Sequence, residues 1–218
     1  SQDAVRTIGA FCRDNGIDAH YRPDGWLWTA ADQSQDDAWA DIVAIHEKLG
    51  SDAFQSLTPT EVQRRAASKG HIAGIFEPAV ATVQPARLAR GLRKAALARG
   101  VTIHENTSMT GLDKGATPRV RTANGSVTAN KIVLSMGTWA AERPEFRRTM
   151  VPVSADMIAT APMADRLREI GLTTGVAISD SSMLVSYYRT TLDGRIVFGK
   201  GGGKFGFAGQ VGTKFDGP

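Results

Sequence analysis

The chain has 218 residues, with 26 basic and 22 acidic side chains and a formal net charge of +4 at pH 7. This length is enough for one large domain, or one and a half smaller ones, with a substantial buried core. The basic residues are spread along the sequence, so nucleic-acid binding is not indicated. We expect no membrane span, because no apolar run is long enough, and residues 1–10 show no export signal.

The single cysteine, Cys12, excludes an internal disulfide and a zinc site built from several cysteines. It is compatible with a reducing compartment, so we expect a cytoplasmic protein. His46 and Glu47 begin a metalloprotease-like string, but Gly50 stands where the second histidine ligand is needed. We therefore expect no metal site. The other histidines are isolated from further ligand types: His20, His71 and His104.

Turn and capping signals divide residues 1–76 into short elements. The Asn-Gly pair at 15–16 is a typical helix stop, and the Pro-Asp-Gly string at 23–25 is a strong turn. Thr58 and Glu61, with a proline between them, form a capping box that begins a helix. The predicted elements are a helix over 3–14, a hairpin of strands 19–22 and 26–30, helices over 32–49 and 58–67, and a strand over 72–76.

The next stretch predicts part of a parallel sheet. Apolar spacing indicates a helix over 85–99, and the strand 101–105 follows it directly. Segments 120–123 and 127–136 then flank an Asn-Gly turn. The second segment contains the apolar run 132–134, and a continuous apolar strand is typical of a sheet covered on both faces.

A mainly antiparallel block begins near residue 150. We expect a long strand over 151–161, a short helix over 164–169, and a final hairpin of strands 183–189 and 195–199 around an Asp-Gly turn. The chain is thus predicted to combine a parallel α/β part with an antiparallel α+β part.

A glycine string near the end has the spacing of a dinucleotide fingerprint, at Gly201, Gly203 and Gly206. Such a fingerprint must open a helix and be followed by an acidic residue about twenty positions later. The residues after Gly206 have no helical pattern, so we interpret the string as a loop.

The helix predicted over 85–99 is strongly basic. Its cations are Arg87, Arg90, Arg93, Lys94 and Arg99. A solvated outer face is favoured over contact with phosphate or nucleic acid, because the apolar side chains lie on the opposite side of the helix.

Two longer strings resemble one known family. Residues 77–99, EPAVATVQPARLARGLRKAALAR, precede GVTIHENTSMTGL and RVRTANGSVTANKIVLSMGTWA. This order is similar to the flavoproteins related to D-amino-acid oxidase. Residues 178–203, ISDSSMLVSYYRTTLDGRIVFGKGGG, resemble the branch that contains gamma-glutamylputrescine oxidoreductases.

The resemblance implies a fold and a domain plan. It implies α/β plus α+β architecture, with an incomplete Rossmann-like layer for FAD and an antiparallel-sheet domain for the substrate. Residues 1–15 and 77–149 would belong to the partial FAD-binding domain, and 16–76 and 150–218 to the substrate-binding domain. It also implies FAD-dependent oxidation of an amine or amino acid, in which the flavin accepts a hydride from the carbon that bears the amine.

The resemblance places candidate FAD contacts at the ends of two predicted strands. Thr107, Ser108 and Met109 would lie near the adenosine part, and a second group would approach the cofactor where the buried strand ends. This second group contains Ser135, Met136, Gly137 and Trp139. Both assignments agree with the rule that ligands sit at the carboxyl ends of parallel strands. The alternative is that these residues only terminate core strands.

Tyr187, Tyr188 and Arg189 are the candidate substrate-binding residues. On a strand, 187 and 189 share one face and 188 takes the other, so we expect Tyr187 and Arg189 to face substrate and Tyr188 to pack inside. A guanidinium offers a planar fork of donors to a carboxylate. The alternative is a tyrosine pair that packs a sheet, with an ion-paired arginine at its edge. No catalytic base is assigned.

This sequence departs from the family in several places. The family's first glycine fingerprint and its closing segment have no counterpart here, and Lys200 replaces an expected glycine. We therefore expect these 218 residues alone to bind FAD weakly or not at all, and to be inactive alone. The segments 101–105 and 132–136 would leave an apolar edge, which favours a homo-oligomer. The rival interpretation is a non-catalytic remnant or interaction module that keeps the fold without cofactor.

Overall fold

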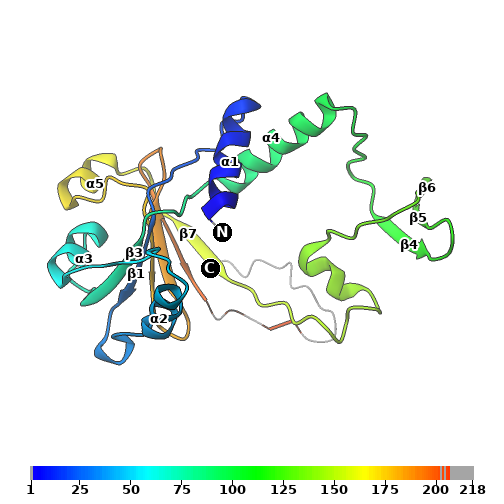
Figure 1. Cartoon of the computed structure of the whole chain (residues 1–218). Helices are drawn as coiled ribbons and strands as arrows, with labels where there is room; N and C mark the ends of the chain where they lie inside the picture. Colours follow the sequence, from blue (N-terminus) through cyan, green and yellow to red (C-terminus); the bar gives the residue numbers. More distant parts are fainter. Residues whose placement is uncertain (1, 202, 204, 207–218) are drawn as a thin grey trace. The chain divides into compact units, whose positions relative to one another are not determined.

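The computed structural model describes residues 2–201, 203, 205 and 206. The chain divides into two compact units (Figure 1). The first is formed by Ser1–Arg93 with Val153–Lys204, and the second by Lys94–Pro152 with Phe205–Pro218. The domain limits expected from the sequence stay a prediction. The combination of parallel and antiparallel pairing is confirmed, as the following paragraphs describe.

A seven-stranded sheet dominates the first unit, in the order β2-β3-β1-β8-β9-β10-β7. Its strands are β1 Trp26–Ala30, β2 Gln55–Ser56, β3 Ala73–Glu77, β7 Asp156–Ala159, β8 Ala177–Asp180, β9 Ser186–Thr190 and β10 Ile196–Lys200. Neighbouring strands are antiparallel except β1 and β8, which are parallel. The sheet is therefore made from two distant parts of the chain, joined at one parallel pair.

One face of this sheet is covered by two helices. Leu27 and Ile178, which pair across β1 and β8, pack in a buried cluster with Ala66 of α3 (Pro59–Ala66) and Leu167 of α5 (Ala164–Ile170). Figure 1 shows α3 and α5 on the same side of the sheet. This side is called the helix-covered face below.

The opposite face carries alternate residues of the same strands. Ala30 and Ile75 pack there against Trp39 and, through Val43, against α2 (Ala40–Lys48). Farther along β1, Trp26 and Trp28 project from this face, and their rings stack with centroids 5.2 Å apart. Because side chains alternate along a strand, the side chains of Trp26, Trp28 and Ala30 lie on the face opposite Leu27. This side is called the open face below.

Two further helices belong wholly or partly to the first unit, α1 (Gln2–Asp14) and α4 (Pro85–Ala98). Cys12 of α1 is buried, with 3% of its surface exposed. Gly91 of α4 lies so close to Ile17 that a Cβ atom would have no room. Of the apolar positions that predict these helices, Cys12 and Ala95 are buried, whereas Ile8 and Leu92 are exposed.

The capping signal before α3 is only half realised. The Thr58 hydroxyl accepts a hydrogen bond from the Glu61 amide at 3.3 Å, and Pro59 is the first helical residue. The Glu61 carboxylate does not return to the cap. It instead accepts from Arg64 and Arg65, and these hydrogen bonds lower the pKa of Glu61 to about 2. Charged donors one turn away outcompete a single backbone amide.

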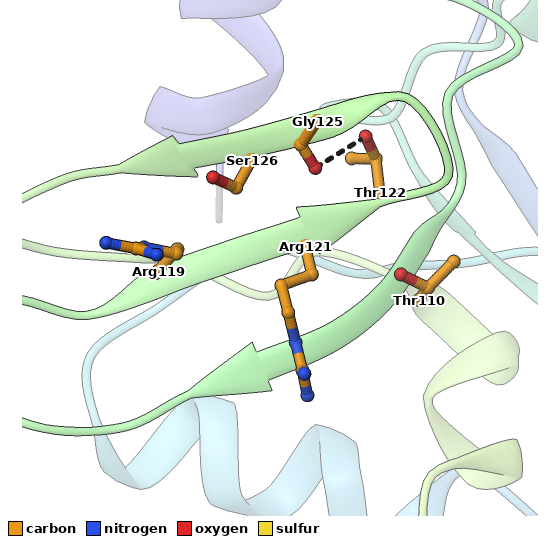
Figure 2. A pocket seen from close by; sticks show the side chains of 6 residues that line it. All are labelled: Thr110, Arg119, Arg121, Thr122, Gly125 and Ser126. Atoms are coloured by element: carbon orange, nitrogen blue, oxygen red, sulfur yellow. Dashed lines mark hydrogen bonds between the residues drawn. The ribbon is translucent and has the colours of Figure 1, made fainter.

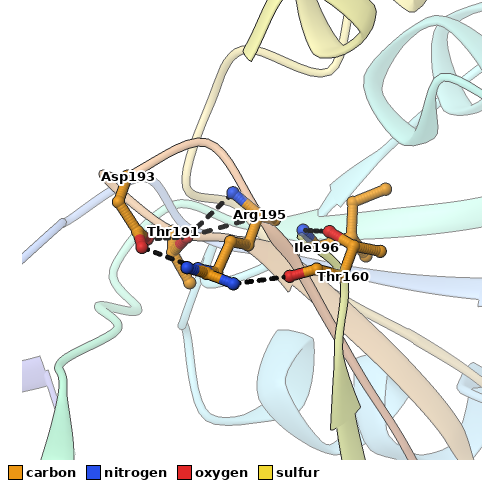
Figure 3. Close-up of polar contacts among 5 residues, drawn as sticks. All are labelled: Thr160, Thr191, Asp193, Arg195 and Ile196. Carbon is orange, nitrogen blue, oxygen red and sulfur yellow. Dashed lines mark hydrogen bonds and ion pairs between the residues drawn. The ribbon is translucent and has the colours of Figure 1, made fainter. Parts of the chain in front are cut away.

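The turn between β9 and β10 is tied to the next strand by polar contacts (Figure 3). The Arg195 guanidinium donates to the Asp193 carboxylate at 2.7 Å and to the Thr160 carbonyl at 2.8 Å. The Ile196 amide donates to the Thr160 hydroxyl at 3.1 Å. Gly194 in this turn has φ = 77°, which explains the Asp-Gly signal in the sequence.

The second unit contains a separate antiparallel sheet of three strands. Its strands are β4 Met109–Asp113, β5 Arg119–Thr122 and β6 Gly125–Thr128, in the order β4-β5-β6. A 3-10 helix, η2 (Gly137–Glu142), follows in the chain.

Two strands predicted for the parallel layer are absent from the described residues. Residues 101–108 form no strand, and β4 begins only at Met109. Residues 129–136 also form no strand, because the hairpin strand β6 ends at Thr128. Val133, expected to be buried on both faces, is 85% exposed. An extended segment becomes a strand only when a neighbour satisfies its backbone groups, and no described strand pairs with these two.

Other boundaries differ from the predictions. Residues 19–22 do not form a hairpin with β1; Arg22 instead bridges to Thr82, and β1 pairs with β3 and β8. The helix predicted over 32–49 is divided into η1 (Gln33–Gln35) and α2, and the strand predicted over 151–161 is shorter, at Asp156–Ala159. Pairing between distant segments decides where these elements begin and end, and the spacing of residues along the chain does not reveal that pairing.

The first prediction concerns the helix-covered face. Leu27 has no exposed surface, so Leu27→Ala should lower the free energy of unfolding by about 2–5 kcal/mol, from lost transfer energy and a cavity. The control Leu49→Ala removes a side chain that is 77% exposed and should change it by less than about 0.5 kcal/mol. Urea unfolding followed by circular dichroism measures both. Similar losses for the two variants would contradict this account of the core.

Candidate functional site

Strand β9 sends its candidate residues to opposite faces, as a period of two predicts. Tyr188 pairs with Ile178 and packs on the buried cluster of the helix-covered face. Tyr187 and Arg189 therefore lie on the open face. Both are half-buried, and Tyr187 is paired with Ser179 on one side and Gly199 on the other.

Arg189 has hydrogen bonding but no carboxylate partner among the described residues. Its Nη2 donates to the Val83 carbonyl at 3.0 Å. Burial, with the neighbouring Arg22, lowers the pKa of the Arg189 guanidinium below its ordinary value. The group stays charged at neutral pH, because an arginine loses its proton only under extreme conditions. A half-buried cation without a counter-ion is a candidate anion-binding group.

The neighbouring Arg22 is different, because its charge is compensated. Its guanidinium lies 3.1 Å from the Asp24 carboxylate and donates to the Thr190 hydroxyl at 3.1 Å. The Asp24 carboxylate also accepts from the Gly175 amide at 2.6 Å. Arg22 is thus fixed by the protein itself, and of these two arginines only Arg189 lacks an acidic partner in the described chain.

Aromatic side chains continue the open face beyond Tyr187. Trp28 of β1 pairs with Ser179 of β8, which in turn pairs with Tyr187 of β9. The Trp26 indole donates to the Ser179 hydroxyl at 2.9 Å, which fixes the stacked tryptophan rings. Glu77 of β3 is paired with Trp26 at the other end of this row. The open face therefore offers aromatic surface between an arginine and a carboxylate.

Behind the sheet, Tyr188 is linked to a histidine that sequence reasoning did not select. The Tyr188 hydroxyl donates to the Ala66 carbonyl at 2.9 Å, so its oxygen accepts from His71 Nε2 at 3.0 Å. This pattern places the proton of neutral His71 on Nε2. Its buried Nδ1 has no hydrogen-bond partner in the described part of the chain. An isolated histidine gives no local signal of such a contact, because Tyr188 is far away in the sequence.

Burial sets the charge of this pair. It lowers the pKa of His71, and the charge of Asp180 opposes that shift only in part. Burial also raises the pKa of Tyr188 to about 12. His71 and Tyr188 are thus held neutral, as expected for polar groups inside a packed core.

The candidate FAD contacts lie in the second unit. Thr107 and Ser108 precede β4, whose first residue is Met109, and the Thr107 hydroxyl donates to the Glu105 carbonyl at 2.8 Å. Ser135 and Met136 precede η2, which begins with Gly137 and contains Trp139, 55% exposed. These residues end loops rather than the strands that we expected. Their role in binding FAD stays a prediction.

A polar hollow lies on the three-stranded sheet of the same unit (Figure 2). It is lined by Thr110, Arg119, Arg121, Thr122, Gly125 and Ser126. Arg121 is 3.3 Å from the Asp113 carboxylate, so its charge is compensated. The Thr122 hydroxyl donates to the Gly125 carbonyl at 3.1 Å and so closes the β5–β6 turn. We therefore interpret the hollow as a structural feature of this sheet rather than as a binding site.

Two other features are absent from the part of the chain that the structure describes. Its residues contain no group of three or more histidine, cysteine or acidic side chains that could hold a metal ion. Within the same residues, no helix combines the length and apolar character that a membrane crossing requires.

Comparison with protein families gives a match along almost the whole chain. The model described as "DAO: FAD dependent oxidoreductase" matches residues 1–216. The chain belongs to this family of FAD-dependent oxidoreductases.

Curated members of the family are longer than this chain. Gamma-glutamylputrescine oxidoreductase of Escherichia coli (strain K12) is 24% identical over 212 residues, which cover 91% of this chain and 50% of that protein. Glycine oxidase of Pseudomonas putida is 29% identical over 152 residues, covering 65% of this chain and 39% of that protein. The chain thus spans about half the length of the first relative and a smaller share of the second.

Solved structures of the family share the fold. Glycine oxidase from Geobacillus kaustophilus superimposes with a TM-score of 0.71 at 17% identity, covering 92% of this chain and 55% of that one. L-proline dehydrogenase from P. horikoshii gives a TM-score of 0.72 at 16% identity, covering 98% and 56%. This chain therefore shares its mixed α/β fold with these two solved structures.

The second prediction follows from His71. Its folded-state pKa lies below the ordinary value of 6.5, so the unfolded chain binds the proton more readily. This term leaves stability unaffected well above pH 6.5 and reduces it as the pH falls through 6.5 towards the lower folded value. We expect His71→Gln to lose less stability than the wild type between about pH 8 and pH 5.5.

Urea unfolding at both pH values measures this effect. The difference between the proteins at pH 8 reports changed packing, and only the change between the two pH values reports titration. Equal losses in the two proteins would show that His71 is not kept neutral by the fold.

Proposed function

We propose that the chain provides the substrate-binding face of an FAD-dependent oxidoreductase that acts on the CH–NH group of an amine or amino acid bearing a carboxylate. The observation that carries this proposal is Arg189, a half-buried guanidinium on the open face without an acidic partner in the described residues. Membership of the family supports the reaction class. The curated relatives include a glycine oxidase, whose name states an amino-acid substrate.

The charge of Arg189 needs an anion to be compensated. Removing a cation from water costs free energy, and a backbone carbonyl such as that of Val83 returns only part of it. A substrate carboxylate fits the planar fork of donors and would complete the compensation. Arg22 is not assigned to the substrate carboxylate, because Asp24 already compensates its charge.

Tyr187 and the aromatic row complete the proposed binding surface. The Tyr187 ring on β9 and the stacked Trp26 and Trp28 rings on β1 line the open face, with β8 between the two strands. Aromatic surface excludes water and strengthens the interaction between Arg189 and a carboxylate. These side chains bind and orient the substrate in the proposal, and no described side chain is assigned as a catalytic base.

The described residues do not by themselves fit the pyrophosphate of FAD. A pyrophosphate site needs backbone amides of a glycine-rich turn at the start of a helix. No described helix follows such a turn, and α4 begins at Pro85 after Gln84, whose side chain accepts from the Arg87 amide instead. We therefore derive no step through the flavin.

The third prediction tests this conclusion. The 218 residues, purified alone and mixed with FAD, should retain little flavin through gel filtration, because the described residues form no amide cradle for the pyrophosphate. Absorbance of the flavin relative to protein measures retention. A stoichiometric yellow complex would show that the contacts proposed at 107–109 and 135–139 suffice.

The fourth prediction tests the role of Arg189. In the flavin-loaded enzyme that carries this chain, Arg189→Met should raise KM for a carboxylate-bearing amine by about 10-fold or more, because a charge-assisted hydrogen bond is lost. KM for a plain amine should change much less. Steady-state kinetics with both substrates measures the difference.

A matched control is Arg166→Met, which removes a cation of α5 that is exposed and paired with Glu169. It should leave both KM values unchanged. Equal effects of Arg189→Met on the two substrates would reduce Arg189 to a structural residue. An absence of flavin-dependent turnover in the wild type would favour the non-catalytic remnant.

A further inference from the structure

The ring of Tyr187 lies over the position of Gly199 on the next strand. Its Cε2, Cζ and Oη atoms all come within 3.0 Å of the point where a Cβ atom of Gly199 would stand, with Oη at 2.6 Å. Real Cβ atoms essentially never approach a neighbour so closely. The space left by the missing side chain of Gly199 is therefore occupied by the phenol ring.

We infer that Gly199 is a positioning residue: its missing side chain sets where the Tyr187 hydroxyl stands on the open face. The inference rests on the proposed function, in which Tyr187 contacts the substrate. Gly199 itself touches no substrate in this proposal and acts only through the ring above it.

Backbone conformation does not explain the glycine. Gly199 does not have a positive φ, so an L-amino acid could adopt its backbone angles. It also sits in regular antiparallel pairs, with Tyr187 on β9 and Met157 on β7. Glycine inside a strand weakens it, and close approach of another group is a common reason for its presence. Here the approaching group is identified.

The geometry gives the ring a definite direction. Tyr187 is flanked by Ser179 of β8 and Gly199 of β10, and its ring leans over the glycine. The hydroxyl is thus carried away from Ser179. A methyl group at 199 would displace the ring from β10 and move the hydroxyl relative to Arg189, which shares its face.

The obstacle is the end of a flexible side chain rather than backbone. A methyl group at 199 is therefore accommodated by turning Tyr187, and the strand pairing can persist. Gly203 shows the contrast, because the nearest obstacles to its Cβ include backbone atoms of Ser154. Gly201 provides a matched control, since its Cβ would meet only ordinary contacts, the nearest at 3.5 Å from the Val185 nitrogen.

The fifth prediction uses 19F NMR of the chain labelled with 3-fluorotyrosine. The sequence has three tyrosines, so three signals can be assigned with Tyr→Phe variants. Gly199→Ala should shift the Tyr187 signal most and leave that of Tyr21 in place. Gly201→Ala should leave the Tyr187 signal where it is. An unchanged Tyr187 signal in Gly199→Ala would overturn the inference without touching the test of Arg189.

A double-mutant cycle covers the case in which Gly199→Ala damages the fold. The stability change caused by Gly199→Ala is measured in the wild type and in Tyr187→Ala. If the ring is the obstacle, the substitution should be less destabilising when the ring is absent. Equal changes in both backgrounds would mean that the methyl group clashes elsewhere, and the inference would fail.

The same cycle, read by kinetics in the flavin-loaded enzyme, separates positioning from stability. Gly199→Ala should lower kcat/KM by about 10-fold in the wild type, since displacement by about 1 Å is costly in a site. It should have almost no effect in Tyr187→Ala. A displaced ring with unchanged kcat/KM would remove Gly199 from the positioning role. A different result would count against the proposed carboxylate site and not against the role of Gly199. In that result, Gly199→Ala displaces the ring and lowers kcat/KM as expected, but Arg189→Met affects both substrates equally.

Discussion

The parallel pairing of β1 with β8 is the constraint on which the first unit depends. It joins residues about 150 positions apart and is reinforced by side chains on both strands. The Thr29 hydroxyl donates to the Ser179 carbonyl at 3.1 Å, and the Ser181 hydroxyl donates to the Thr29 carbonyl at 3.0 Å. Leu27 and Ile178 then bury their side chains together. Without this joint, β2-β3-β1 and β8-β9-β10-β7 would be two separate small sheets.

This joint also explains why the two faces differ in chemistry. On the helix-covered face, the Tyr188 hydroxyl is neutral and both donates and accepts a hydrogen bond. The open face carries Arg189 and Glu77 on either side of the aromatic row. In the proposed function, the substrate binds on the open face, while the helix-covered face holds the buried cluster around Leu27.

Sequence reasoning succeeded where information is local. The Asp-Gly turn, the Thr58 cap and the alternation of Tyr187, Tyr188 and Arg189 need only neighbouring residues, and each has its counterpart in the structure. It failed at 101–105 and 132–136, where an apolar run was taken as a strand without a partner. The contacts of His71 with Tyr188 and of Gly199 with Tyr187 were missed for the same reason. Their partners are fixed by the fold, and no short pattern records a contact across a sheet.

The buried cysteine of α1 has a consequence for how the protein can be studied. Cys12 is 3% exposed, and a thiol inside a packed helix is chemically inert until the helix opens. Because it is the single cysteine of the sequence, its modification by a thiol reagent has one possible origin. The rate of that reaction therefore measures how often α1 opens locally, and no cysteine has to be added to the sequence for the measurement.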